Sequence, residues 1–254
     1  MKEIFAFEDL DQAAPHKDFA HALFQKLVHY QLILREDFGL NESPKAVIWT
    51  PEELATSIFS TTPIPAFTRK DLIYMSPIVE EWKEIFLKQL DGQDLPIIRN
   101  YYERNTESQM MEILAHELTH HIDLFMEDFD TGNWENEIWF EEGMCFYLPR
   151  KLLLDELAFD EISTIERALV TTFADKYGKH SLSEFGSKSY EGNLTSIMYD
   201  YWRSYLAVKE LVDRENGDIS AVFQHYHNWY NEGNKGSLLH YFNLEDYFKE
   251  DRKN

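Results

Sequence analysis

The chain has 254 residues, enough for one large domain or for two lobes, and 44% of them are hydrophobic, as is typical of a folded globular protein. The formal net charge of −22 argues against nucleic acid and against an anionic membrane as partners, because both are recognised by basic surfaces. We therefore expect a soluble protein that binds neither nucleic acid nor membrane.

The cysteine content and the N-terminal segment favour a cytoplasmic protein. Cys145 is the only cysteine, so an intramolecular disulfide and a cysteine-based zinc site are excluded. The first residues lack the apolar core of a signal peptide, and no segment has the apolar length of a membrane span. We expect a cytoplasmic location.

The spacing of hydrophobic residues predicts a mixed first half. Apolar side chains recur every three or four positions over residues 18–38, which indicates a helix. Two short β-like runs follow at 46–49 and 71–75, and the Pro-containing stretch 61–65 between them must be extended or turning. Residues 77–90 again have helical spacing.

The next predicted helix carries the first chemical motif. Thr106-Glu107-Ser108-Gln109 has the form of a capping box, which predicts that the helix begins at Thr106. Apolar positions continue this helix to about Met126, so the motif at residues 116–120 is expected in the middle of a helix.

The second half of the chain is predicted to be all helical, with helices over about 134–149, 163–177 and 194–214. The expected fold class is α+β and mainly helical. We expect an α/β lobe over 1–130 and a helical lobe over 131–254, together forming one catalytic unit.

His116-Glu117-Leu118-Thr119-His120 is an HExxH motif. Residues four apart lie on one face of a helix, so both imidazoles can bind one ion. Neutral imidazole suits Zn²⁺, which takes three protein ligands at a catalytic site and leaves one position for water. Glu117 lies beside the metal and can accept a proton from water, whose pKa zinc lowers to about 7.

A third ligand is indicated downstream, in a Trp139-x-x-Glu142-Gly143-x-x-x-Tyr147 pattern. Here the chain resembles the gluzincins, the superfamily of thermolysin-like and aminopeptidase-like zinc peptidases, in which the Glu of such a pattern completes the zinc site. The resemblance implies a zincin-like catalytic unit with Glu142 as the third ligand. Glu141 is the competitor, and the match to the Glu-Gly pair favours Glu142.

Other acidic and histidine side chains near the motif are assigned weaker roles. Asp123 lies seven residues after His116 on roughly the same face, and we interpret it as a solvated residue or a hydrogen-bond partner of a ligand. Glu135 and Glu137 are expected to decorate the first turn of their helix. His121 points away from the HExxH face and is not expected to be a ligand.

A donor to the oxyanion is also needed for peptide hydrolysis. The stretch around Tyr201 resembles the helix of aminopeptidase-like gluzincins in which a Tyr, three residues before a small residue, serves this role; Ser204 is that small residue. The resemblance implies that Tyr201 is catalytic. Four further side chains remain alternatives: Tyr199, Tyr205, His225 and His227.

The chain departs from the superfamily in two respects. It lacks a Gly-x-Met-Glu-Asn motif, so aminopeptidase activity is not implied, and Phe146 stands where thermolysin-like members have an Asp four residues after the third ligand. In the superfamily the substrate commonly pairs with the edge strand of a small sheet, and residues 71–75 are our candidate for that edge.

The sequence therefore predicts a zinc-dependent peptidase that acts on a peptide or protein substrate, with zinc as its cofactor. One alternative is a gluzincin-like protein that binds zinc or a peptide without hydrolysis. A second is a helical interaction protein in which the HExxH sequence is coincidental.

Overall fold

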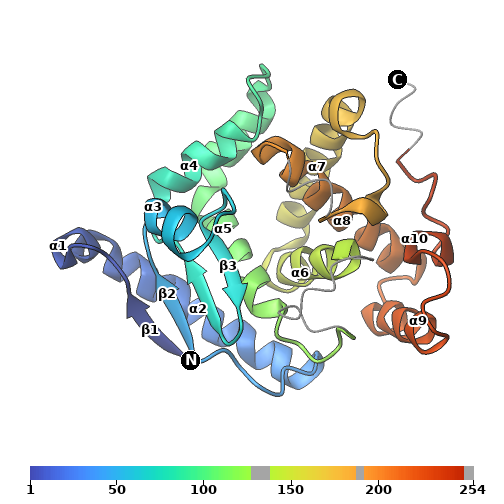
Figure 1. Ribbon diagram of the computed structural model, residues 1–254, viewed down its shortest axis with the longest axis horizontal. Helices are drawn as coiled ribbons and strands as arrows, with labels where there is room; N and C mark the ends of the chain where they lie inside the picture. Colours follow the sequence, from blue (N-terminus) through green and yellow to red (C-terminus); the bar gives the residue numbers. More distant parts are fainter. Residues whose placement is uncertain (127–137, 187–191, 249–254) are drawn as a thin grey trace. The chain divides into compact units, whose positions relative to one another are not determined.

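A computed structural model describes residues 1–126, 138–186 and 192–248 (Figure 1). These residues form a mainly helical α+β fold with a small sheet, so the predicted fold class is confirmed. The chain divides into two units, Met1–Asp123 (unit 1) and Leu124–Asn254 (unit 2). The predicted lobe boundary between residues 130 and 131 lies outside the described residues.

Unit 1 contains a four-stranded sheet in the order β1-β2-β4-β3. The strands are β1 (Lys2–Phe5), β2 (Ala46–Trp49), β3 (Ala66–Arg69) and β4 (Leu72–Met75). β1, β2 and β4 run parallel, whereas β3 runs antiparallel to β4. The predicted runs at 46–49 and 71–75 are thus both strands, and β1 and β3 were not predicted.

The prediction that residues 71–75 form the edge of the sheet is wrong. β4 lies between β2 and β3, so β3 is the edge strand next to it. The two strands form a hairpin through Lys70 and Asp71, and Lys70 has a left-handed φ of 52°. A lysine at this position carries no turn signal comparable to Asn-Gly, which is why the hairpin could not be recognised.

Unit 1 also contains helical segments before, between and after the strands. They are α1 (Leu10–Ala13), η1 (Ala14–His16), α2 (Lys17–Asp37), α3 (Glu52–Leu54), the π-helical turn η2 (Ala55–Phe59), α4 (Val79–Lys88) and α5 (Pro96–Thr119). α2 and α4 confirm the helices predicted at 18–38 and 77–90. α5 packs against α2, α4, β3 and β4, and is therefore the central helix of this unit.

Two predictions about α5 are wrong. The helix begins at Pro96, ten residues before Thr106, because proline is well suited to the first helical position. Thr106 is instead buried inside the helix, where its hydroxyl donates to the Tyr102 carbonyl oxygen (2.8 Å). The helix also ends at Thr119 and not near Met126, so the HExxH motif occupies its last turn.

Unit 2 is helical in its described residues, as predicted. Its helices are α6 (Ile138–Leu153), α7 (Glu156–Tyr177), η3 (Leu182–Glu184), α8 (Leu194–Arg214), α9 (Ile219–Asn231) and α10 (Leu238–Tyr241). α8 matches the predicted helix 194–214, α7 begins earlier than predicted at the N-cap Asp155, and the predicted start of α6 at 134 lies outside the described residues. α8 packs on both α6 and α7 (Figure 1).

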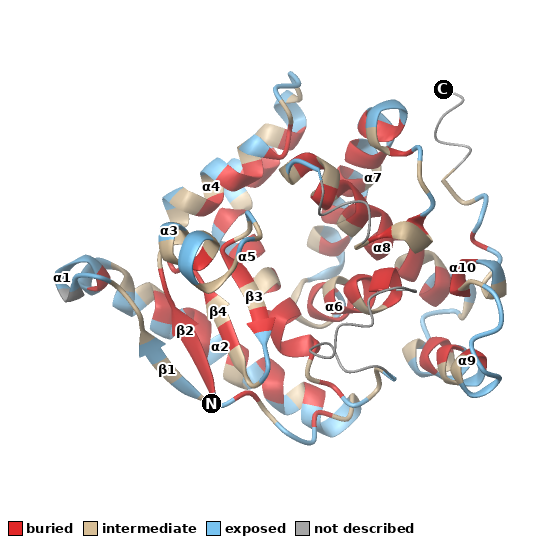
Figure 2. Cartoon of the chain, in the orientation of Figure 1, coloured by how far each residue is buried: buried red, intermediate tan, exposed pale blue. Residues whose placement is uncertain are grey.

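The contact between α6 and α8 depends on Gly143. A Cβ added at Gly143 would lie 2.4 Å from the backbone oxygen of Ser204 and 2.6 Å from a methyl group of Val208. The two helices can therefore approach each other only because position 143 has no side chain. Figure 2 shows that both helices are buried along much of their length.

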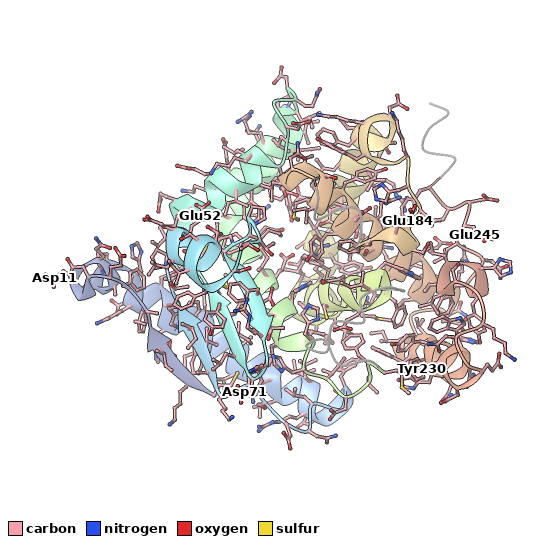
Figure 3. The ribbon with its side chains drawn as sticks, viewed as in Figure 1. Asp11, Glu52, Asp71, Glu184, Tyr230 and Glu245 are labelled. Carbon is pink, nitrogen blue, oxygen red and sulfur yellow. The ribbon has the colours of Figure 1, made fainter. Side chains whose placement is uncertain are left out.

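Acidic side chains are spread over both units, in keeping with the net charge. Figure 3 labels Glu52 on α3, Asp71 at the β3–β4 turn, Glu184 on η3 and Glu245 after α10. None of the described helices has the length and apolar character needed to cross a membrane.

Candidate metal centre

The two histidines of the HExxH motif meet at the end of α5. His116 and His120 are buried, with exposed fractions of 4% and 9%, and their Nε2 atoms are 3.1 Å apart. The rings are nearly perpendicular, with centroids 4.8 Å apart. The four-residue spacing thus brings both imidazoles together, as predicted from helical geometry.

This spacing suits a zinc ion. Two nitrogens bound to one zinc ion at about 2.0–2.1 Å in tetrahedral geometry lie about 3.4 Å apart, close to the observed separation. The same separation also permits an N–H···N hydrogen bond between neutral imidazoles. The pair is therefore arranged so that little movement is needed to bind a metal ion.

The last turn of α5 is held by a buried contact with α2. The Thr119 hydroxyl donates its one proton to the Ala115 carbonyl oxygen (2.8 Å). In its contact with the Tyr30 hydroxyl (2.8 Å) it is therefore the acceptor, and Tyr30 is the donor. Thr119 and Tyr30 are both inaccessible to solvent. The contact fixes the end of the helix between His116 and His120, and its residues are 89 positions apart, which is why sequence reasoning missed it.

Two further carboxylates of α5 are buried in this region of the helix. Glu117, next to His116, has an exposed fraction of only 6%. Glu112, one turn before His116, accepts a hydrogen bond from the Gln109 amide (2.7 Å), which also donates to the Tyr101 hydroxyl (3.2 Å). Glu112 was not singled out from the sequence, although its spacing of four residues from His116 places both on one helical face.

Glu142 lies on α6 in unit 2 and is buried, with an exposed fraction of 2%, whereas its neighbour Glu141 is partly exposed. Trp139 and Tyr147, which flank it in the sequence pattern, are buried as well. The residue after it is Gly143, whose lack of a side chain lets α6 approach α8. The pattern thus describes a tightly packed helix with one buried carboxylate.

The three tyrosines of α8 lie in different surroundings. Tyr201 is partly exposed, and its ring packs edge-on against Phe146 of α6 and against Phe185 (centroids 5.6 and 5.0 Å). Tyr199 and Tyr205 are buried, and the Tyr205 hydroxyl lies 2.6 Å from that of Ser163. Among the three, Tyr201 is the one with solvent access.

Tyr205 also borders a buried ion pair that was not foreseen. The Arg150 guanidinium lies over the Tyr205 ring (4.2 Å) and donates to Glu166 (2.6 Å). Both charged side chains are almost fully buried. Burial raises the pKa of Glu166, and Arg150 opposes that rise.

The remaining candidates have other contacts. Asp123 accepts hydrogen bonds from the backbone and side chain of Asn41, and His121 lies 2.7 Å from the Thr68 hydroxyl of β3. His225 is exposed beside Glu215, and His227 donates to the Leu124 carbonyl oxygen (2.7 Å). Two predicted positions, Glu135 and Glu137, lie outside the described residues.

Comparison of the chain with models of protein families, with curated proteins and with solved structures finds no match. The resemblance to gluzincins therefore depends on the motif residues alone.

Proposed function

We propose that the chain is a zinc-dependent peptidase in which His116, His120 and Glu142 bind one zinc ion. The observation that carries the proposal is the buried pair of imidazoles at the end of α5, with Nε2 atoms 3.1 Å apart. Two nitrogen ligands and one carboxylate are a common ligand set for catalytic zinc, and they leave the fourth position open.

Burial supports Glu142 over Glu141 as the third ligand. A carboxylate attracts a metal ion more strongly where bulk water is excluded. Glu142 is buried and Glu141 is partly exposed, so Glu142 is the better placed of the two to bind an ion.

The roles of the other residues follow from their chemistry. A bound zinc ion would polarise the scissile carbonyl and acidify water. Glu117 takes the proton from the attacking water and passes it to the leaving amine, which a buried carboxylate next to a metal ligand is suited to do. The Tyr201 hydroxyl donates a hydrogen bond to the developing oxyanion.

The edge strand of the sheet supports a peptide as the substrate. β3 packs against α5, the helix that carries both histidines. An extended peptide can pair with the backbone of such an edge strand. This role was assigned to residues 71–75 from the sequence, and the strand order transfers it to β3.

The first test is the zinc content of the protein purified without added metal, measured by elemental analysis for wild type, Glu142→Ala and Glu141→Ala. We expect about one zinc ion per chain in wild type and in Glu141→Ala, and a clear loss in Glu142→Ala. Glu141→Ala is the matched control, since it removes the same group one position along the same helix. Absence of zinc from wild type after supplementation would refute the proposal.

The second test separates catalysis from zinc binding. Glu117→Gln keeps the shape of the side chain but removes the base, so it should retain zinc and lose cleavage of labelled casein by at least about 100-fold. Full activity in Glu117→Gln would contradict the mechanism. Zinc binding without cleavage by the wild type would instead favour a protein that binds zinc or peptide without hydrolysis.

A further inference from the structure

His121 connects the end of the HExxH motif to the edge strand. It directly follows His120, and its Nε2 atom lies 2.7 Å from the Thr68 hydroxyl on β3. The Thr68 hydroxyl donates its one proton to the Leu72 carbonyl oxygen (3.3 Å), so the ring nitrogen of His121 is the donor in the shorter contact. Thr68 is buried, which shields the bond from water.

Thr68 also has a particular place in the sheet. The Ser76 backbone N–H donates to the Pro65 carbonyl oxygen, so Pro65 directs its backbone carbonyl toward the β4 side. In an antiparallel ladder every second residue does the same, and in this register the next two are Phe67 and Arg69. The Met75 carbonyl oxygen accepts from Thr50, which agrees with this alternation. The N–H and C=O groups of Thr68 therefore point away from β4, toward the side of β3 on which no described strand pairs.

We propose that His121 is a positioning residue: its hydrogen bond to Thr68 sets the place of the β3 edge relative to His120, and thereby the register in which an extended peptide pairs with β3. The inference rests on the proposed peptidase function, in which an extended peptide pairs with β3. The substrate touches the β3 backbone, and His121 acts on it only through Thr68.

The chain offers a matched pair of variants for this bond. Thr68→Val keeps the branched shape that suits a strand and removes the hydroxyl, whereas Thr68→Ser keeps the hydroxyl. His121→Leu removes the donor from the other side. The probe is fluorescently labelled β-casein, cleaved by the full zinc-loaded chain, with zinc content and melting temperature measured for every variant.

We expect Thr68→Val to raise KM for casein about two- to tenfold, the range that one net hydrogen bond supplies, with zinc content unchanged. Thr68→Ser should restore most of the affinity. The double variant with His121→Leu should be no worse than the poorer single variant, because both changes remove the same bond. Hydrogen exchange of the amides at 66–69 should be faster in Thr68→Val than in Thr68→Ser.

Several results would overturn the inference while leaving the peptidase intact. These are a wild-type KM in Thr68→Val, equal damage by Thr68→Val and Thr68→Ser, or additive effects of Thr68→Val and His121→Leu. A wild-type protein that neither holds zinc nor cleaves casein would instead refute the proposed function, and with it the substrate role given to β3. Hydrogen exchange distinguishes failure of the positioning inference from failure of the proposed function, since it reports on the His121–Thr68 bond and requires no peptidase activity.

Discussion

Replacement of Gly143 by alanine tests the packing that surrounds the proposed ligand Glu142. An added Cβ would meet the Ser204 backbone oxygen at 2.4 Å, where an ordinary contact begins at about 3.4 Å. The obstacle is backbone, which cannot rotate away as a side chain does. α6 and α8 must therefore separate by roughly 1 Å, or the helices must bend.

Two effects of opposite sign decide the magnitude. Alanine in place of glycine inside a helix stabilises by about 1 kcal/mol through backbone entropy. Overpacking of a tight interface costs about 1–3 kcal/mol, and contact with a rigid backbone places this site at the upper end of that range. We expect the free energy of unfolding to fall by about 1–2 kcal/mol, with a fall in melting temperature of about 2–8 °C.

The assay is urea unfolding of Gly143→Ala in two further backgrounds. Val208→Ala removes the methyl group that the new Cβ meets at 2.6 Å, so it should relieve part of the cost. Ser204→Ala leaves the obstructing backbone oxygen in place, so it should relieve none. A Gly143→Ala variant more stable than wild type would show that helix propensity outweighs packing here, and would refute the reasoning.

Four further outcomes are expected. Lys70→Asn should stabilise the protein by about 0.5–1 kcal/mol in urea unfolding, because Lys70 has a φ of 52° and asparagine tolerates the left-handed region better; a lower midpoint would contradict this. Arg150→Leu should destabilise by about 3 kcal/mol at pH 7 and by less in acid, where the buried Glu166 becomes protonated; an equal loss at both pH values would count against the ion pair. Burial is the largest cause that raises the pKa of Glu81 above 4.5, so protonated Glu81 stabilises the folded protein fully below pH 4.5, and this stabilisation is lost as the pH rises through the raised pKa. The free energy of unfolding of wild type, relative to that of Glu81→Gln, should therefore fall as the pH rises from 4.5 through the raised pKa. A difference that does not change with pH would refute this prediction. Chelation should lower the melting temperature, and Zn²⁺ but not Mg²⁺ should restore it; a melting temperature indifferent to the chelator would argue against a metal bound to the native state.

Local spacing was sufficient to predict much of the helical framework. The helices at 18–38 and 194–214 were correctly predicted because their apolar positions repeat at the helical period, which depends only on neighbours in the sequence. The approach of His116 to His120 follows from the same rule, since four residues make about one helical turn. These are properties of single helices.

The wrong predictions have local causes as well. The prediction that the helix begins at Thr106 was wrong because a threonine hydroxyl can also donate to the carbonyl oxygen four residues earlier inside a helix. Thr106 does so, in a helix that begins at Pro96. The edge strand was misplaced because β3 contains polar Thr68 and Arg69, and its turn contains neither glycine nor asparagine.

Other features depend on which elements pack together, and no spacing along the chain encodes them. Tyr30 meets Thr119 across 89 positions, and Thr68 meets His121 across 53. Gly143 is required by the backbone of Ser204 on another helix, although in the sequence it was only half of a Glu-Gly pair. The sequence therefore predicts the residue types and the local geometry of the candidate metal centre. The tertiary structure determines the contacts that hold its helix and its edge strand, because those contacts form only when distant segments are packed together.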